Sequence, residues 1–219
     1  MTVLIQSKLS RPIAEQRFLL CDRTPEQYRH LLAALGEERS VRLTYDRGKI
    51  ELVMPLELHE FSRELIGLFI RILVAELGLK LKSLGSTRLD RPDLDRAAEP
   101  DLAYYIQNQP KVAGKTIDLN TDPPPDLVVE IDITHTDIDK LNLYASLGIP
   151  EFWRYNGQEW KIYALQTDRT YQELSQSPTF PTIEKAQLYQ FLAASEQDEI
   201  AAEAQLRQQL RSSVISDRQ

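Results

Sequence analysis

Hydrophobic and polar residues alternate along two stretches of the chain in a pattern that predicts β-hairpins. Residues 41–46 alternate apolar and polar side chains, "DRG" at 46–48 is a turn signal, and the alternation resumes over 49–54. The stretch "EFWRYNGQEWKIYAL" at 151–165 alternates on both sides of Asn156-Gly157, the dipeptide that a type I′ turn prefers. We therefore predict hairpins over 41–54 and 151–165, with a further edge strand in "TYQELSQS".

Helical periodicity appears elsewhere, in three segments at 24–35, 57–77 and 136–148. Thr24 and Thr136 stand where N-cap residues are expected, and Gly78 and Gly148 suit the C-terminal ends of the helices that precede them. The tail beyond residue 182 also has a helical pattern. The segment before Thr24 has mixed polarity and little periodicity, so we predict an arm there.

Three apolar runs predict further strands, at 80–89, 101–106 and 127–132. Between them we predict a charged loop at 90–100 and a long loop at 107–125. The resulting order of elements, with one parallel crossover near 137–150, indicates an α/β or α+β sheet with helices on its faces. We expect three parts: an N-terminal arm at 1–23, one domain at 24–192 and a C-terminal helical tail at 193–219.

Composition narrows the class of protein only slightly. The 219 residues carry a formal net charge of -7 and a single cysteine, Cys21, which fits a reducing cytoplasm. No apolar stretch is long enough to cross a bilayer, the N-terminus does not resemble a secretory signal, and one cysteine with three histidines does not readily build a zinc site. The negative charge argues against a surface that grips nucleic acid everywhere, but it leaves room for a local basic groove.

Two carboxylates interrupt the apolar run at 127–132. Glu130 and Asp132 share one face of the predicted strand, toward its carboxyl end, where open α/β sheets place their ligands. The alternative is that the strand simply leaves the core there and both acids are solvated.

A second acidic strand start favours the functional interpretation. Asp101 lies in Pro100-Asp101-Leu102, which repeats the form of Pro125-Asp126-Leu127. If the two strands are neighbours, Asp101 and Glu130 converge, and two carboxylates with open positions for water suit Mg²⁺. We expect Lys140 one turn into the helix that follows this strand, so that a short loop folds it back toward Glu130, although it also fits an ordinary surface lysine.

The helix at 57–77 offers further candidates. Glu57, Glu60 and Glu64 form a polar stripe that, taken alone, indicates a solvated face. Glu60 becomes a candidate ligand if the helix crosses the sheet near Asp101. His59 is a candidate proton or phosphate partner or a structural histidine. Four arginines near the proposed site are candidate phosphate contacts or ordinary solvated residues: Arg63, Arg88, Arg91 and Arg96.

Six segments in order resemble the Uma-two family of restriction-endonuclease-type proteins. They are "RLTYDRGKIELVMP", "LHEFSRELI", "SLGSTRL", "EPDLAYYI", "PPPDLVVEIDIT" and "DKLNLYASLGIPEFWRYNG", and the resemblance covers residues 24–192. That family is similar to the PD-(D/E)XK nuclease superfamily. The resemblance implies a restriction-endonuclease-like core of helix, three strands, helix and strand, with added hairpins.

The resemblance also implies Mg²⁺-dependent hydrolysis of DNA phosphodiesters, with Mn²⁺ as a substitute. It assigns the metal to Asp101, Glu130, the carbonyl of Ile131 and Glu60, and it adds Lys140 and His59 as catalytic residues. The superfamily's usual lysine position holds Asp132 here, so Lys140 is the matching candidate.

DNA is the implied partner, and a homodimer would place two sites on opposite strands. Two alternatives stay open. One is a catalytically inactive module of nuclease fold that binds DNA or a protein partner. The other is a hydrolase of another phosphoester.

Overall fold

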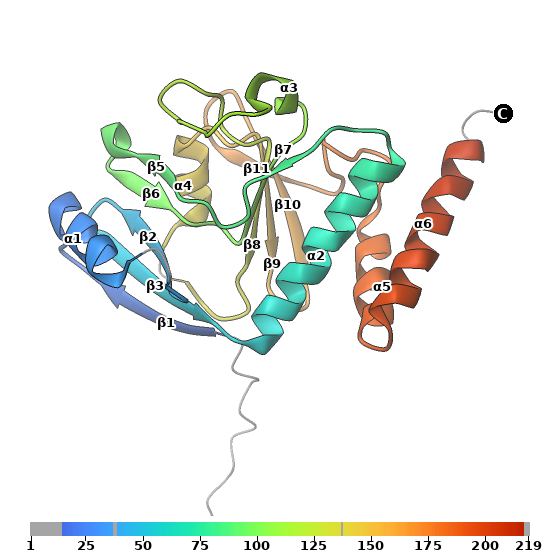
Figure 1. Ribbon diagram of the computed structural model, residues 1–219, viewed down its shortest axis with the longest axis horizontal. Helices are drawn as coiled ribbons and strands as arrows, with labels where there is room; N and C mark the ends of the chain where they lie inside the picture. Colours follow the sequence, from blue (N-terminus) through green and yellow to red (C-terminus); the bar gives the residue numbers. More distant parts are fainter. Residues whose placement is uncertain (1–14, 37–38, 137, 217–219) are drawn as a thin grey trace, which may run out of the picture.

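The computed structural model describes residues 15–36, 39–136 and 138–216, and within them two β-sheets are flanked by helices (Figure 1). The first sheet has five antiparallel strands in the order β1 (Glu15–Leu20), β3 (Lys49–Pro55), β2 (Arg42–Asp46), β6 (Arg96–Ala98) and β5 (Leu89–Arg91). The second has six, in the order β11 (Tyr171–Leu174), β10 (Trp160–Leu165), β9 (Glu151–Tyr155), β8 (Leu127–Ile131), β7 (Leu102–Tyr105) and β4 (Lys82–Ser83).

The second sheet is mixed, because β8 and β9 run parallel while its other pairs are antiparallel. The connection between these two strands contains α4 (Lys140–Ser146), as a parallel pair requires. Helix α2 (Glu57–Glu76) precedes the three antiparallel strands β4, β7 and β8. The predicted order of helix, three strands, helix and strand is therefore confirmed, and so is the mixed α/β fold class.

Each face of the six-stranded sheet buries its own hydrophobic core. On one face Val129 and Trp153 pack with Phe69 of α2 and with helices α5 (Lys185–Ser195) and α6 (Glu199–Ser216). These three helices lie together in Figure 1. On the other face Val128 and Phe152 pack with α4. Burial on both faces explains why β8 is an almost continuous apolar run before its acids begin.

Helix α1 (Pro25–Leu35) covers part of the five-stranded sheet, and it begins as predicted. The hydroxyl of Thr24 accepts a hydrogen bond from the backbone N–H of Gln27 at 3.1 Å, and the Gln27 side chain accepts one from the Thr24 N–H at 3.0 Å. This reciprocal capping box satisfies two backbone donors that the helix leaves unpaired. The hairpin β2–β3 is also confirmed.

Several local predictions are wrong. Residues 90–100 are not a loop, because they contain the end of β5, a 3₁₀ turn (Pro92–Leu94) and β6. The predicted strand at 80–89 divides between β4 and β5, in different sheets, and a short helix α3 (Gln109–Val112) interrupts the loop at 107–125. The β9–β10 hairpin pairs Tyr155 with Trp160, so its loop is four residues long and not a two-residue type I′ turn.

Two further differences concern the ends of elements. Residues 15–20, within the predicted arm, form β1 and pair with β3. Helix α4 is capped by the side chain of Asp139, which accepts from Asn142 N–H at 3.0 Å, and not by Thr136. Asp137, which we expect at the N-terminal end of this helix from the sequence, lies outside the described residues. The division into arm, domain and tail stays a prediction. In the described ranges no helix combines the length and the apolar composition that crossing a membrane requires.

Candidate active site

Asp101 and Glu130 face each other across neighbouring strands. Asp101 immediately precedes β7, and Leu102 of that strand pairs with Val129 of β8. Continuing this antiparallel register by one residue places Asp101 opposite Glu130, on the same face of the sheet. Asp101 Oδ2 also accepts the backbone N–H of Ile131 at 2.7 Å. The two strands are therefore neighbours, and the Asp101 and Glu130 side chains converge as the metal-site hypothesis requires.

Lys140 turns back to the end of β8. Its Nζ lies 2.6 Å from Glu130 Oε2 and 3.1 Å from Asp132 Oδ1. Lys140 is the first residue of α4, and not one turn into it as predicted. A cation is unfavourable at a helix N-terminus, and here the two buried carboxylates offset that cost. One turn later, the hydroxyl of Tyr144 hydrogen-bonds to Glu130.

His59 and Glu60, adjacent on α2, have different surroundings. His59 is 1% exposed, and its Nε2 lies 3.2 Å from Asp101 Oδ1, yet neither imidazole nitrogen makes a hydrogen bond. The Glu60 side chain is 36% exposed and lies 2.9 Å from an Arg42 nitrogen and 2.7 Å from Arg63 Nε. The structure therefore brings His59 directly to Asp101, whereas Glu60 is connected to Asp101 by two bridging residues: Arg42, whose other nitrogen contacts Asp101, and His59, whose Nδ1 lies 3.5 Å from Glu60.

Two arginines of this cluster were missed by reasoning from the sequence. Besides Arg42, Arg17 of β1 lies 2.7 Å from Glu15, 2.9 Å from Glu51 and 2.8 Å from Asp132. Its position had been assigned to an arm, and Arg42 had been one polar residue in a hairpin. The available signal was weak, since it consisted only of charged residues at alternate positions of strands.

A model of the Uma2 family, described as "Putative restriction endonuclease", matches residues 25–195. The chain belongs to the Uma2 family. A crystal structure described as "a putative nuclease belonging to DUF820" from Anabaena variabilis is similar over 68% of this chain and 90% of that one, with 18% identity and a TM-score of 0.49. None of the curated proteins matches the chain.

Carboxylates crowd the Uma2 site, and their pKa values diverge. Burial raises the pKa of Glu130 to about 7; Lys140 opposes this rise, and the neighbouring Asp101 and Asp132 add to it. Burial also acts to raise the pKa of Asp101, but His59 and Arg42 outweigh it and hold that pKa well below its usual range. Buried carboxylates this close together repel one another when all are ionised, and a bound cation would stabilise their ionised forms.

Lys140 stays charged in this setting. Burial acts to lower its pKa, but Asp132 and Glu130 outweigh burial and raise the pKa above the ordinary lysine value. The Lys140 side chain is thus an ammonium at neutral pH, with three N–H donors and no lone pair to accept a proton. It can orient or stabilise an oxygen but cannot act as a general base.

The donor set fits a hydrated divalent cation. In the described part of the chain, no group of three His, Cys, Asp or Glu side chains is assembled as a metal cage. Mg²⁺, however, usually takes only one or two carboxylates and keeps its waters. Asp101, Glu130 and His59 line a small cavity of about 10 Å³, where both His59 nitrogens are buried without a well-aligned hydrogen-bond partner. Buried polar atoms left unpaired call for a further partner.

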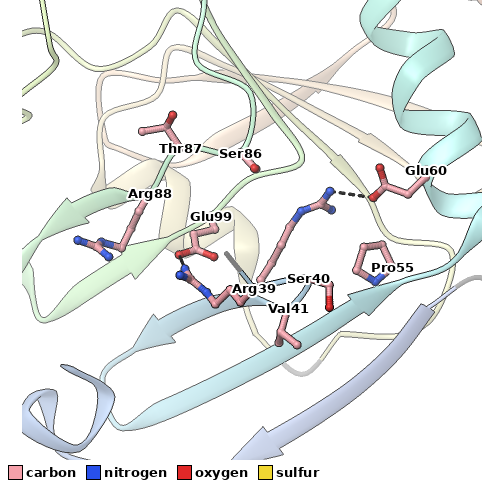
Figure 2. A pocket seen from close by; sticks show the side chains of 10 residues that line it. Arg39, Ser40, Val41, Pro55, Glu60, Ser86, Thr87, Arg88 and Glu99 are labelled. Atoms are coloured by element: carbon pink, nitrogen blue, oxygen red, sulfur yellow. Dashed lines mark hydrogen bonds and ion pairs between the residues drawn. The ribbon is translucent and has the colours of Figure 1, made fainter. Parts of the chain in front are cut away.

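An open cleft of about 720 Å³ lies next to this cluster (Figure 2). Glu60 faces it from α2, and Arg39, Arg88 and Glu99 line it from the other side. The other predicted phosphate contacts do not line it. Arg96 is buried against Asp46 at 2.9 Å, and Arg91 pairs with Asp93 at 2.7 Å, while Arg63 pairs with Glu60 and Glu64.

Proposed function

We propose that this Uma2 chain is a metal-dependent endonuclease that hydrolyses DNA phosphodiester bonds with an activated water. The observation that carries the proposal is the contact of Lys140 with Glu130 at 2.6 Å, beside Asp101 on the neighbouring strand. Family membership supports nuclease activity, and this constellation supports the choice of mechanism.

Asp101 and Glu130 would hold the metal, together with the backbone carbonyl of Ile131. Glu60 would complete the shell by way of bound water, because the structure links it to Asp101 through Arg42 and His59 and not by direct contact. Mg²⁺ is the expected ion and Mn²⁺ the expected substitute. The chemistry such an ion supplies when bound is Lewis acidity, which makes a water more acidic and offsets the charge that builds on a phosphodiester.

The protein's own groups would position the reactants. Lys140 donates hydrogen bonds to the attacking water and to the negatively charged phosphate oxygens. His59 is placed to hold a proton next to Asp101: burial lowers its pKa, but Asp101 outweighs burial and raises it above the usual value. Water loses a proton as it adds to phosphorus, one P–O ester bond breaks, and the leaving alkoxide takes up a proton, so that one proton is released and one is consumed.

Cleavage of plasmid DNA with Mg²⁺ or Mn²⁺ tests the proposal. We expect Asp101→Asn and Lys140→Met to lower the rate by about a hundredfold or more, the effect typical of removing one electrostatic contact to a transition state. Glu173→Gln, which changes an exposed acid on β11, is the matched control. Equal rates in all four proteins would mean that the activity belongs to a contaminant or to another site.

Asp132 at the usual lysine position favours a second candidate, an inactive module of nuclease fold that binds DNA or a protein partner. Thermal unfolding separates the two. A ligand that binds only the folded state stabilises it by about 2.7 kcal/mol at a concentration one hundred times its Kd. Stabilisation by Mn²⁺ that Asp101→Asn abolishes supports the nuclease, and its absence from the wild type favours the inactive module.

We also propose a homodimer, because two copies would place two sites on opposite DNA strands. Light scattering checks this against the protomer mass of 25.2 kDa. The proposed setting is the cytoplasm, where the exposed thiol of Cys21 would stay reduced. DNA itself is the proposed substrate, and phosphoesters of other kinds are the comparison substrates.

A further inference from the structure

Arg42 lies between two spaces in the molecule. It lines the open cleft of about 720 Å³. It also lines the small cavity of about 10 Å³ whose other lining residues include Asp101, Glu130 and Lys140. Of the residues lining both spaces, Glu99 is held in place by the Leu43 N–H at 3.0 Å and by an ion pair with Arg39. Arg42 is the cation of the wall between the two spaces, and it pairs with one acid on each side, Asp101 in the cavity and Glu60 in the cleft.

The Arg42 guanidinium occupies the oxygen of Asp101 that a metal would need. One oxygen, Oδ2, already accepts the N–H of Ile131, so Oδ1 is the oxygen left for an ion. Arg42 contacts Oδ1 with one nitrogen and Glu60 with the other, at 2.9 Å. A carboxylate oxygen cannot offer the same lone pairs to a guanidinium and to a divalent cation. His59 Nε2 also faces Oδ1, at 3.2 Å, so an ion at Asp101 competes with Arg42 for the remaining lone pair of that oxygen.

The cleft provides a destination for the displaced guanidinium. Its described lining combines three arginines with the hydroxyls of Ser40, Ser86 and Thr87, and these outnumber its two carboxylates, Glu60 and Glu99. No aromatic side chain on which a base could stack is among the described lining residues. Arg39 and Arg88 each keep a buried Nε without a hydrogen-bond partner. Guanidinium and hydroxyl groups without aromatic platforms suit a phosphate group better than a base.

We propose that the cleft binds a phosphodiester of the nucleic-acid backbone and that Arg42 is exchanged between Asp101 and that phosphate. In the free protein Arg42 substitutes for the metal's charge at Asp101. When a phosphate enters the cleft, Arg42 turns to it and Asp101 becomes free for the ion. Arg42 is the first residue of β2, and a change of its side-chain rotamer leaves the backbone pairing of the strand intact. The inference rests on the proposed nuclease function. It adds an order of binding, in which the substrate binds first and promotes metal binding.

Two measurements test this without relying on cleavage. In the absence of DNA, titration with Mn²⁺ should show that Arg42→Gln binds the ion about tenfold more tightly than the wild type, within the usual range of coupling between two ligands. Arg42→Lys should fall between them, because lysine cannot bridge Asp101 and Glu60 bidentately. In EDTA, DNA binding by Arg42→Gln should lose about 0.9 from the slope of log K against log salt, as expected for one lost phosphate contact. Arg91→Gln, outside the cleft, should match the wild type in both assays.

The outcomes separate the inference from the proposed function. If the wild type binds Mn²⁺ through Asp101 and Arg42→Gln binds it equally or more weakly, the inference is wrong while the nuclease proposal stands. An unchanged salt slope for Arg42→Gln likewise overturns the phosphate contact. If no variant binds Mn²⁺, the nuclease proposal fails and the competition at Asp101 fails with it. If Arg42→Gln does not fold, Arg42→Lys must still bind Mn²⁺ more tightly than the wild type.

Discussion

Replacing Glu130 by glutamine should remove a specific part of the pH dependence of stability. The pKa of Glu130 is about 7 in the folded protein and 4.5 in an unfolded chain, chiefly because of burial, with Asp101 and Asp132 adding to the shift and Lys140 opposing it. Between these values the folded state binds more protons than the unfolded state. The stabilising contribution is therefore fully present below pH 4.5 and is lost as pH rises through 7.

The size of this contribution follows from the pKa change. Moving a pKa from 4.5 to about 7 corresponds to about 3 kcal/mol. For a chain of this length 1 kcal/mol shifts Tm by about 2–4 °C, so the wild type should lose about 6–12 °C relative to Glu130→Gln across this range. Only the slope against pH is diagnostic, because glutamine also leaves Lys140 with one fewer carboxylate at every pH.

Urea unfolding at pH 4.5, 5.5, 6.5 and 7.5, without divalent ions, measures the effect at constant temperature. Glu173→Gln, an exposed acid given the same chemical change, is the control and should follow the wild type. The pKa values of His59 and Glu99 are also raised, so these groups also make the protein less stable as pH rises. Their contribution is the same in all three proteins and does not affect the comparison. If the wild type and Glu130→Gln show the same slope, the account of Glu130 as a carboxyl crowded by buried like charges is wrong.

Three further substitutions test other parts of the structure. Lys140→Met should cost about 3–5 kcal/mol at pH 7 by urea unfolding, because it leaves buried carboxylates without their shared cation; a loss below 1 kcal/mol would contradict this. Asp126→Ala should cost about 3 kcal/mol by the same assay, since it removes the acceptor of two backbone N–H groups, and should leave Mn²⁺ binding unchanged. Glu76→Gln should speed hydrogen exchange in α6 by weakening its ion pairs to Arg207 and Arg211 at 2.9 and 2.8 Å, whereas equal protection would show that apolar packing alone holds α6.

Much of the fold could be predicted from local sequence, because its long elements follow ordinary periodicity. Helices α1 and α2 and strand β8 are examples. Strand β1 was missed because its pattern is inverted: Phe18 is 54% exposed, while Glu15 is buried and Arg17 points inward to the acid cluster. A rule that places apolar residues inside cannot find such a strand. Strands β5 and β6 are three residues each, too short to show a period.

The candidate site divides in a similar way. Asp101, Glu130 and Lys140 could be predicted because each stands at the end of a strand or the start of a helix, where local patterns locate it. Arg42 is 59 residues from its partner Asp101, and Arg17 is 115 residues from Asp132. Their roles depend on how the five-stranded sheet packs beside the acids, and no local pattern reports that packing. The missed residues are thus cations that reach the acids from another sheet.

The two Pro-Asp-apolar motifs show why local sequence could not settle the site. Asp101 and Asp126 each precede a strand and accept a backbone N–H at the end of the neighbouring one, from Ile131, the last residue of β8, at 2.7 Å and from Ile106, just after β7, at 2.6 Å. Because β7 and β8 are antiparallel, these positions lie at opposite ends of the pair. The second oxygen of Asp126 is satisfied by the amide of Asn108 at 2.6 Å.

The second oxygen of Asp101 instead meets His59 and Arg42, at the end of β8 where α4 begins and delivers Lys140. The same motif therefore has the same backbone role twice, and it becomes a candidate metal ligand only where the crossover to α4 starts. Position in the sheet, and not the motif itself, separates a structural aspartate from a candidate catalytic one. This is also why Asp126→Ala is the comparison for Asp101→Asn: each removes a carboxylate at a strand end, but only the second should abolish Mn²⁺ binding.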